Sequence, residues 1–452
     1  MLSTSPVINS RNLIVDYYDL IPQAVARVGA TAGGPPGTPG FAPGFELPEL
    51  TADVCEYFAA ATAGWRTLGE YRDHPIQFLD LTGNPGTRTT KTFASLLIVA
   101  RAVEHIRRTG ESVCIFTPTS ANKGVALRDA VGRALAAGLV EPHQLSVVVL
   151  APASTAHKFR VDPLSEYADL NPLLRFSAGP AEGVKALGRA FVDEYAAEAH
   201  AKYGLTLWYS LDLKNYLVAD AARAAFEADA SPTSAAGPRW HAHAVSSAFG
   251  LLGYNLGRDL LEASGRAEAA DRPGFLLIQH LGTPDMVLNL RNGSFDRANL
   301  PTYRPDPDGG WAQRDDPHFP QVTDDPDEVL DPTFYTHQPV TSPAMNELIR
   351  THGGDGIVVS RRECVRRYPE LREWFAGSSR PLPADPAELR EWSIVMASTG
   401  VLEAIDRGLV PPGVEIVLHG SGGYTGDDYV TADAYTEVST VEEIAATVLG
   451  SR

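Results

Sequence analysis

The chain has 452 residues, of which 44% are hydrophobic and 21% are charged, as is ordinary for a soluble globular protein. A chain of this length can bury a large core, and it predicts two or more subdomains. The formal net charge of −18 argues against a nucleic-acid-binding surface, because such surfaces are basic. Composition therefore indicates an acidic globular protein, which can still contain a local anion site.

The sequence carries no clear targeting or metal signal. The first twenty residues have no uninterrupted apolar segment, since Asp16 and Asp19 interrupt it, and the chain has no run of 18 apolar residues. The three cysteines lie far apart and lack a CxxC spacing, so we expect neither a disulfide framework nor a zinc site. We therefore expect a cytoplasmic protein without a membrane span and without a bound metal.

Two intervals are too rich in Gly and Pro for regular structure, residues 30–50 and about 297–343. The second is expected to run over the surface or over the site. Its acidic part, near residues 306–331, is interpreted either as a surface loop or as a lid or dimer arm.

The segment 81–97, LTGNPGTRTTKTFASLL, is the first that could carry chemistry. Asn84-Pro85-Gly86 predicts a turn, and an apolar helical face begins at Phe93, so Lys91 falls at or just before the first helical turn. A cation is disfavoured at a helix N-terminus, and the free N–H groups there could lie beside a bound anion. The alternative interpretation is an ordinary solvated lysine.

From Ser112 onward, short apolar runs alternate with helical patterns. The apolar runs predict strands at 112–118, 145–152 and 205–210. The helical patterns between and after them predict helices at 122–138, 181–204 and 215–228. Further strand patterns follow near 241–245, 274–282 and 413–420. This alternation predicts an α/β fold with mainly parallel sheets, with ligands at the carboxyl ends of the strands.

Three later strand-to-loop junctions also carry polar side chains. In TPTSANKGVAL, the residues Thr119, Ser120 and Asn122 open a helix, where an ordinary N-cap is the alternative. In HAVSSAFGLLG, small and hydroxyl residues could form an anion-binding loop. His241 and His243 share a strand face there, but two core or interface histidines are a better interpretation than a zinc site.

The last junction is GVEIVLHGSGGYTG, residues 413–426. It lacks the third glycine of a dinucleotide-binding fingerprint, and His419 stands where a nucleophile elbow needs its first glycine. The glycines are better interpreted as letting the backbone approach a flat ligand closely.

The order of these four junctions resembles the pyridoxal-phosphate (PLP) enzymes of fold type II, and within them the threonine synthase group most closely, over about residues 78–424. TGNPGTRTTKTFASL looks like the group's Asn-Pro-Thr-Gly-Ser-Phe-Lys turn, which implies that Lys91 is the Schiff-base lysine. PTSANKGVAL looks like its Ser-Ser-Gly-Asn-Thr-Gly loop, which implies that Asn122 contacts the cofactor's 3′ oxygen. By the same analogy, Thr119 and Ser120 are the expected substrate-binding residues.

The C-terminal half of the resemblance implies the remaining cofactor contacts. The residues that stand where the family has its glycine-rich phosphate cup are Ser246, Ser247, Ala248, Phe249 and Gly250. GVEIVLHGSGGYTG looks like the strand end that meets the pyridine nitrogen, with His419 in the usual Thr place and Ser421 in the usual His place. Of these two, we expect Ser421 to be the pyridine partner. Ser210 and Tyr216 fall near matching positions of a further family segment.

The chain also departs from the family pattern. The lysine turn has one residue more between Asn-Pro and Lys, and Thr92 and Phe93 stand where the family has Asp and Arg. The phosphate cup has only Gly250 and Gly253 where the family has a cluster of glycines. These departures put the threonine synthase reaction itself in question and suggest a specialised substrate.

The resemblance implies two three-layer α/β domains with the cofactor between them, and a homodimer. Residues 1–109 and 237–452 are expected to form the large PLP-binding domain, and residues 110–236 the smaller one. The implied activity is that of a PLP-dependent lyase or replacement enzyme acting on a small α-amino acid with a β- or γ-leaving group. The alternative is a non-catalytic relative that binds a ligand or a partner. A nucleotide-dependent α/β enzyme is the third and least favoured hypothesis.

Overall fold

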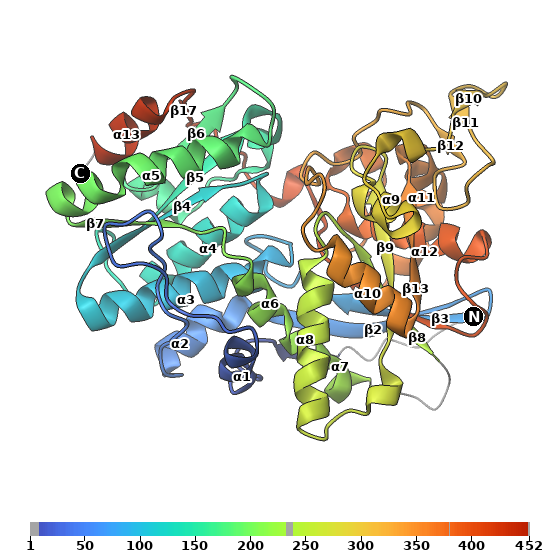
Figure 1. Ribbon diagram of the computed structural model, residues 1–452, viewed down its shortest axis with the longest axis horizontal. Coiled ribbons are helices and arrows are strands. Elements are labelled where there is room, and N and C mark those ends of the chain that lie inside the picture. The colour runs from blue at the N-terminus through green and yellow to red at the C-terminus, as the bar shows by residue number, and fades with distance from the viewer. Residues whose placement is uncertain (1–8, 232–237, 379, 451–452) are drawn as a thin grey trace. The chain divides into compact units, whose positions relative to one another are not determined.

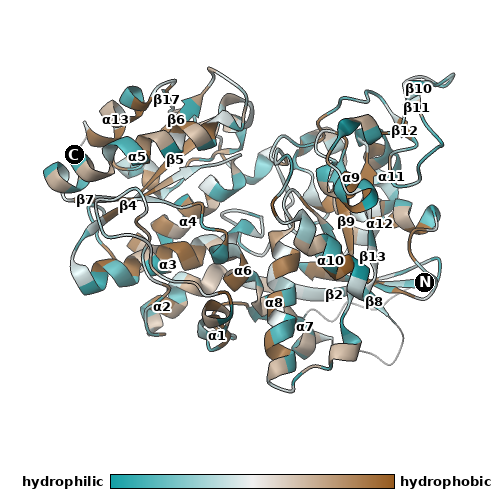
Figure 2. Cartoon of the chain, viewed as in Figure 1, coloured by the Kyte–Doolittle hydropathy of each residue, from teal (hydrophilic) through white to brown (hydrophobic). Residues whose placement is uncertain are grey.

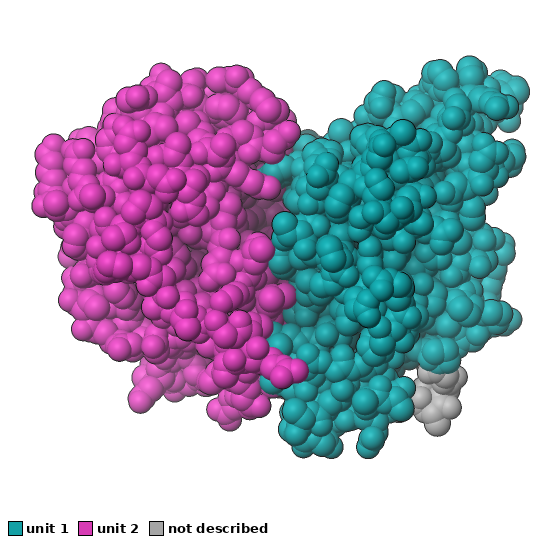
Figure 3. Space-filling model, in the orientation of Figure 1, with its two compact units in different colours: residues 1–11, 62–83, 223–426 teal, residues 12–61, 84–222, 427–452 magenta. Residues whose placement is uncertain are grey.

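A computed structural model describes residues 9–231, 238–378 and 380–450. Within these residues the chain forms two compact units, each assembled from separate stretches of sequence (Figure 3). Of the described residues, unit 1 comprises residues 9–11, 62–83, 223–231, 238–378 and 380–426, and unit 2 comprises residues 12–61, 84–222 and 427–450. The predicted α/β fold with mainly parallel sheets is confirmed in both units.

Unit 2 is built on a five-stranded sheet in which all strand pairs are parallel. In spatial order its strands are β17 (Thr436–Glu437), β6 (Leu173–Phe176), β5 (Leu145–Pro152), β4 (Ser112–Pro118) and β7 (Leu205–Tyr209). Its helices are α1 (Leu20–Arg27), α2 (Ala52–Tyr57), α3 (Lys91–Thr109), α4 (Asn122–Ala136), α5 (Gly183–Tyr203), α6 (Lys214–Asp220) and α13 (Val441–Leu449). The crossovers from β4 to β5 and from β6 to β7 contain the helices α4 and α5, as is usual for parallel strands, whereas two short 3-10 helices lie between β5 and β6.

Apolar side chains explain why unit 2 has three layers. Every residue of β5 is buried, and Figure 2 shows hydrophobic residues along this strand. Side chains alternate along a strand, so Val148 and Leu150 pack with Phe191 of α5 and Ile444 of α13. The intervening residues face α4, where a side chain at Gly124 would press on Val149. Helices therefore cover both faces of the sheet.

Unit 1 contains a seven-stranded sheet in which β2 and β3 pair antiparallel, while β15 is parallel to β3 and β8, and β9 is parallel to β8 and β13. The strands in spatial order are β1 (Asn9–Asn12), β2 (Thr62–Tyr71), β3 (His74–Asp80), β15 (Glu415–Gly420), β8 (Arg239–Ala244), β9 (Gly274–His280) and β13 (Gly354–Val359). The helices are α7 (Ala222–Ala230, all but its first residue in this unit), α8 (Phe249–Ala263), α9 (Asp285–Asn292), α10 (Ser342–His352), α11 (Arg361–Phe375) and α12 (Ser393–Asp406) (Figure 1).

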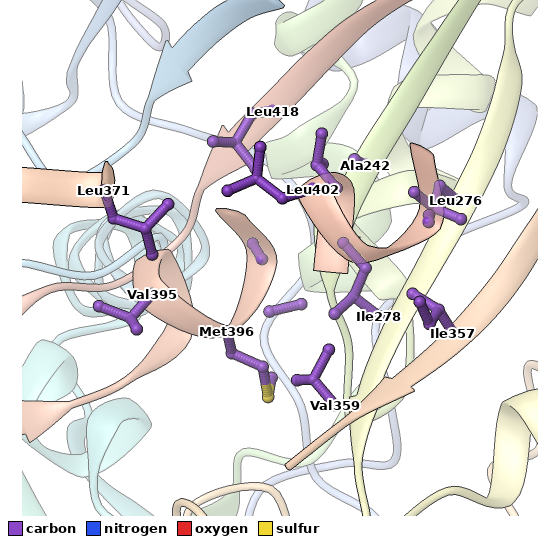
Figure 4. Close-up of a cluster of buried hydrophobic side chains, with 14 of the residues drawn as sticks. Ala242, Leu276, Ile278, Ile357, Val359, Leu371, Val395, Met396, Leu402 and Leu418 are labelled. Carbon is purple, nitrogen blue, oxygen red and sulfur yellow. The ribbon is translucent and has the colours of Figure 1, made fainter. Parts of the chain in front are cut away.

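The core of unit 1 lies between its sheet and the helices α11 and α12. Figure 4 shows Met396 and Leu402 of α12 beside Ile278 of β9 and Leu418 of β15, and all four side chains are buried. His419, the next residue of β15, points to the opposite face of the sheet. The same alternation in β8 places Ala242 in this core and His241 and His243 on the face of His419.

The remaining elements are short. The 297–343 interval holds the three-stranded sheet β10 (Arg304–Pro305), β11 (Trp311–Ala312) and β12 (Val322–Thr323), and β14 (Leu389–Glu391) pairs with β16 (Tyr424–Thr425). The helix expected over 215–228 is two helices, α6 and α7, separated at Ala221. Among the described residues, no helix combines the length and apolar character needed to cross a membrane.

The unit boundaries differ from the expected domains. Residues 84–109 and the C-terminal segment 427–450 belong with β4 to β7, because α3 packs against α4 and α13 packs against α5. Residues 12–61 belong to the same unit. The expected boundary between residues 236 and 237 lies outside the described residues.

Candidate functional site

The turn before Lys91 is fixed by hydrogen bonds to the neighbouring helix α4. The Asn84 side-chain amide donates to Asp129 Oδ2 over 2.8 Å and to Thr92 Oγ1 over 3.2 Å. Arg133 donates to both Asn84 Oδ1 and Asp129 Oδ2, so Asn84 is held from both ends of its amide. The turn is therefore anchored to a rigid helix, as precise placement of a functional side chain requires.

Thr92, at the position of the Asp in the resembled family, stabilises this turn through its hydroxyl. Its side chain is buried, and its hydroxyl lies 2.6 Å from the hydroxyl of Thr87. Between these residues Arg88 has a φ of 56°, an uncommon left-handed conformation for a residue other than glycine. The Thr92 hydroxyl thus helps to close this turn. The length of the turn also differs from the family pattern.

Lys91 is the first residue of α3, as predicted, and no acidic residue occupies the first turn of this helix. Its Nζ lies 5.2 Å from the centre of the Tyr216 ring on α6. This is within the range of a cation–π interaction, which favours the charged amine. Lys91 is therefore oriented toward α6 in the same unit.

The junction between β4 and α4 carries the predicted residues Thr119, Ser120 and Asn122. Thr119 is buried, and its hydroxyl oxygen accepts hydrogen bonds from the backbone N–H groups of Ala121 and Gly124. It therefore caps the start of α4, while Ser120 and Asn122 are partly exposed. Ala121 has a φ of 133°, and such strained residues cluster at functional sites.

Lys123 was not predicted as a site residue. Its amine is buried and donates to Ser210 O over 2.7 Å and to Ser210 Oγ over 3.0 Å. Burial, together with the positive charge of Lys91 and against the charge of Asp212, lowers the pKa of Lys123 to about 7. The sequence did hold a signal, because Lys123 falls on the apolar face of α4 that Leu127, Ala130 and Ala134 define.

In unit 1, the predicted phosphate loop connects β8 to α8. Ala248 precedes α8 with a φ of 51°, and α8 has no side-chain cap at its N-terminus. Ser246 Oγ accepts a hydrogen bond from the Thr336 N–H over 3.4 Å, and the Thr341 hydroxyl donates to Ser247 O over 2.7 Å. The end of the 297–343 interval therefore packs against this loop.

Arg223 is a second site residue that the sequence did not predict. Its guanidinium is completely buried, and a Cβ atom at Gly250 would lie 2.6 Å from its Nη1 atom. The absence of a side chain at Gly250 thus lets a cation lie against the first turn of α8. Cations and free helical N–H groups both favour a bound anion.

A chain of buried imidazoles extends from Arg223. Its Nη1 lies 3.3 Å from His419 Nδ1 and 3.4 Å from His243 Nε2, and His419 Nε2 lies 2.8 Å from His241 Nδ1. His241 Nε2 in turn lies 3.3 Å from Glu227 Oε1. The sequence showed that His241 and His243 share a strand face, and the fold adds His419 from β15.

The contact with Arg223 determines which nitrogen of His419 carries the proton. A guanidinium can only donate, so His419 Nδ1 accepts from Arg223 and His419 Nε2–H donates to His241. Burial, together with the charges of His241, His243 and Arg223, lowers the pKa of His419 well below its usual range. His419 is therefore a neutral imidazole with both nitrogens engaged by protein groups. Ser421, the other candidate, is buried just beyond the end of β15.

The described residues contain no group of three or more His, Cys, Asp or Glu side chains arranged to hold a metal ion. The predicted site residues are divided between the units: Lys91, Thr119, Ser120 and Asn122 belong to unit 2, and residues 246–250, His419 and Ser421 belong to unit 1.

Comparisons with known proteins agree with the fold. A family model described as "Family of unknown function (DUF6002)" matches residues 9–452. Threonine synthase from yeast aligns with a TM-score of 0.52 and 10% identity, covering 86% of this chain and 81% of that protein. No curated protein sequence matches the chain.

Two further solved structures align less closely. PLP-bound threonine synthase from Brucella melitensis has a TM-score of 0.49 and 12% identity, covering 83% of this chain and 78% of that one. A PLP-dependent aspartate racemase has a TM-score of 0.49 and 13% identity, covering 90% of this chain and 95% of that protein. The likeness to the yeast enzyme confirms the predicted fold, that of the fold type II PLP enzymes.

Proposed function

The chain belongs to a family of unknown function, and we propose that it is a PLP-dependent lyase or replacement enzyme acting on a small α-amino acid with a leaving group. The observation that carries this proposal is the lysine at the first position of α3, held by a turn whose hydrogen bonds fix it to α4. The likeness to solved structures supports the fold alone. The proposed cofactor and reaction are supported by the residues of this chain.

The residues present fit such a cofactor in both units. In unit 2, Lys91 is the residue proposed to bind PLP covalently, and Asn122 the one proposed to contact its 3′ oxygen. In unit 1, the loop 246–250 offers two hydroxyls and the N-terminus of α8, and Arg223 places a buried cation against that helix. An anion of the charge of a phosphate is favoured by all of these groups.

Ser421 is the proposed partner of the pyridine nitrogen, because both nitrogens of His419 are engaged by Arg223 and His241. When bound, PLP supplies an electron sink for the carbanion formed at the substrate Cα. A neutral hydroxyl at the pyridine nitrogen favours elimination and replacement over transamination. Ser421 therefore supports the lyase or replacement reaction.

The amine of Lys91 is the proposed acceptor of the substrate Cα proton, for which it has to be neutral. The partly exposed Ser120 is the better of the two proposed substrate-binding hydroxyls, because the Thr119 oxygen already accepts two backbone N–H groups. The identity of the substrate side chain is left open by these residues. A homodimer is proposed from the resemblance alone.

Absorbance spectroscopy tests the proposal. Purified protein mixed with PLP should gain the visible absorbance band of a lysine-bound cofactor, which Lys91→Ala should abolish. Lys202→Ala is the matched control, because Lys202 is exposed on α5. Wild-type protein whose spectrum is only the sum of protein and free PLP would instead favour the non-catalytic ligand-binding alternative.

A further inference from the structure

The carboxyl end of β9 carries polar side chains that the proposed function does not use. Gln279 is buried, and its Oε1 accepts two backbone N–H groups of the first turn of α9, over 2.9 and 3.1 Å. Its amide nitrogen donates to the carbonyl oxygen of Val245, the residue before the loop 246–250. Asp285 is the first residue of α9, and the helix does not depend on its carboxylate for a cap.

The buried Asp285 carboxylate instead holds the end of the 297–343 interval. Its Oδ1 accepts the Gln338 N–H over 2.8 Å, and its Oδ2 lies 3.3 Å from His337 Nδ1. A carboxylate can only accept, so the proton of His337 is on Nδ1. The His337 side chain is 51% exposed, and its second ring nitrogen, Nε2, is the atom that can exchange a proton with a bound molecule.

This imidazole is carried by a segment that is bonded to the predicted phosphate loop on both sides of it. Before His337, the Thr336 N–H donates to Ser246 Oγ over 3.4 Å. After it, the Thr341 hydroxyl donates to Ser247 O over 2.7 Å. Both serines are partly exposed. The segment therefore lies at the carboxyl ends of the parallel strands β8 and β9, the kind of sheet edge at which ligands bind.

Two further titratable side chains near this edge are engaged by the protein itself. Burial lowers the pKa of His280 to about 4, and its Nε2 lies 3.3 Å from the hydroxyl of Thr283. Both oxygens of the buried Asp331 accept backbone N–H groups. Of these three side chains, His337 is the one that combines exposure with a fixed orientation.

We infer that His337, oriented by Asp285, transfers a proton at the side-chain end of the substrate, a role that rests on the proposed function. The Nε2 proton of the imidazolium passes to the departing atom, which takes the electron pair of its broken bond to carbon. The neutral imidazole regains a proton from the incoming nucleophile in a replacement, or from water in an elimination. The substrate class that needs such a residue is an amino acid with a hydroxyl leaving group. In this account Asp285 is a positioning residue.

A comparison of leaving groups tests this role. The full chain is supplied with PLP and with L-serine or L-homoserine, or with their O-acetyl esters, and NMR in D2O follows Cα proton exchange and loss of the leaving group. Acetate departs without a proton and a hydroxyl does not, so His337→Gln should slow loss of hydroxyl about a hundredfold and loss of acetate less than about threefold. Exchange of the Cα proton, which is assigned to Lys91, should persist.

A second readout needs no cofactor. Trace diethyl pyrocarbonate modifies neutral imidazoles, and peptide mass spectrometry reports the modification of His337 in the PLP-free chain. In Asp285→Asn the amide nitrogen can donate to Nδ1 and move the ring proton to Nε2, which should slow this modification severalfold. His143→Gln, at an exposed histidine of unit 2, is the matched control and should change neither the His337 modification nor the loss of a leaving group.

Several results would overturn the inference. They are an equal or absent loss of rate for hydroxyl and ester substrates in His337→Gln, a loss of Cα exchange in that variant, and wild-type protein that exchanges the Cα proton without releasing hydroxyl. Unchanged His337 modification in Asp285→Asn would overturn the role of Asp285. If wild-type protein shows neither the PLP absorbance band nor Cα exchange, the proposed function fails first, and the catalytic role of His337 fails with it.

Discussion

The surroundings of Lys123 in unit 2 and of Arg239 in unit 1 show two ways to bury a cation. Arg239 lies 2.5 Å from Glu227 Oε1 and 2.7 Å from Glu415 Oε2, and although burial opposes its charge, these carboxylates raise its pKa. Lys123 has only the oxygens of Ser210 as hydrogen-bond partners, and its pKa falls to about 7. A compensated charge stabilises a fold, whereas an uncompensated one is available to change its protonation near neutral pH.

The largest expected effect concerns the compensated cation. Arg239→Met leaves Glu227 and Glu415 without their shared partner and should lower the free energy of unfolding by about 3–5 kcal/mol in urea titrations. Arg350→Met removes an exposed i,i+3 pair with Glu347 and should change it by less than about 0.5 kcal/mol. Equal changes in the free energy of unfolding of the two variants would contradict the expected difference between a buried and an exposed ion pair.

The pH dependence of this cluster has a defined sign. Burial opposes the charge of Glu227, yet His241 and Arg239 lower its pKa to about 2, below the value of 4.5 for a free Glu side chain. Its contribution to stability is therefore present above about pH 4.5 and is lost as the pH falls toward 2. Urea titrations of Glu227→Gln should approach the wild-type values over this acidic range.

The uncompensated cation should behave in the opposite way. Lys123→Met removes a buried charge and should raise the free energy of unfolding at pH 7 by about 1–3 kcal/mol. The unfolded chain binds the Lys123 proton below about pH 10.5 and the folded chain only below about 7, so the gain should shrink as the pH rises between these values. A loss of stability at pH 7 would show that the bonds to Ser210 outweigh the buried charge.

A smaller effect is expected at the turn that precedes Lys91. Thr92→Val keeps the shape of the side chain but removes its bonds to Asn84 and Thr87, which should cost about 1–2 kcal/mol in thermal or urea unfolding. The turn should also hold Lys91 less firmly, which the acetylation rate of Lys91 at high pH would report. A Thr92→Val protein with wild-type stability would show that the turn is held by Asp129 and Arg133 alone.

Local sequence patterns predicted the elements but not their buried polar contacts. The strands at 112–118 and 145–152 were predicted with the bounds that β4 and β5 have, because continuous apolar runs mark buried parallel strands. The start of α3 at Lys91 followed from the apolar period after it. The separation of α6 from α7 at Ala221 was missed, because the apolar pattern continues across that residue.

The missed site residues have a common physical reason. Arg223 and Glu227 occur in a helical pattern where charged residues usually face solvent. Their buried partners come from the strands β8 and β15 of the folded sheet and, for Glu227, also from Tyr254 of α8. Lys123 was visible as a lysine on an apolar helix face, but its partner Ser210, the residue after β7, is distant in sequence. Long-range pairing of polar groups is not encoded in any local period.

Reduction with borohydride in the presence of PLP identifies the lysine that binds the cofactor. We expect a stable pyridoxyl adduct on the peptide that contains Lys91, with Lys123 unmodified, and no adduct in Lys91→Arg. An adduct on Lys123 or on another lysine of wild-type protein, or no adduct at any lysine, would contradict this expectation.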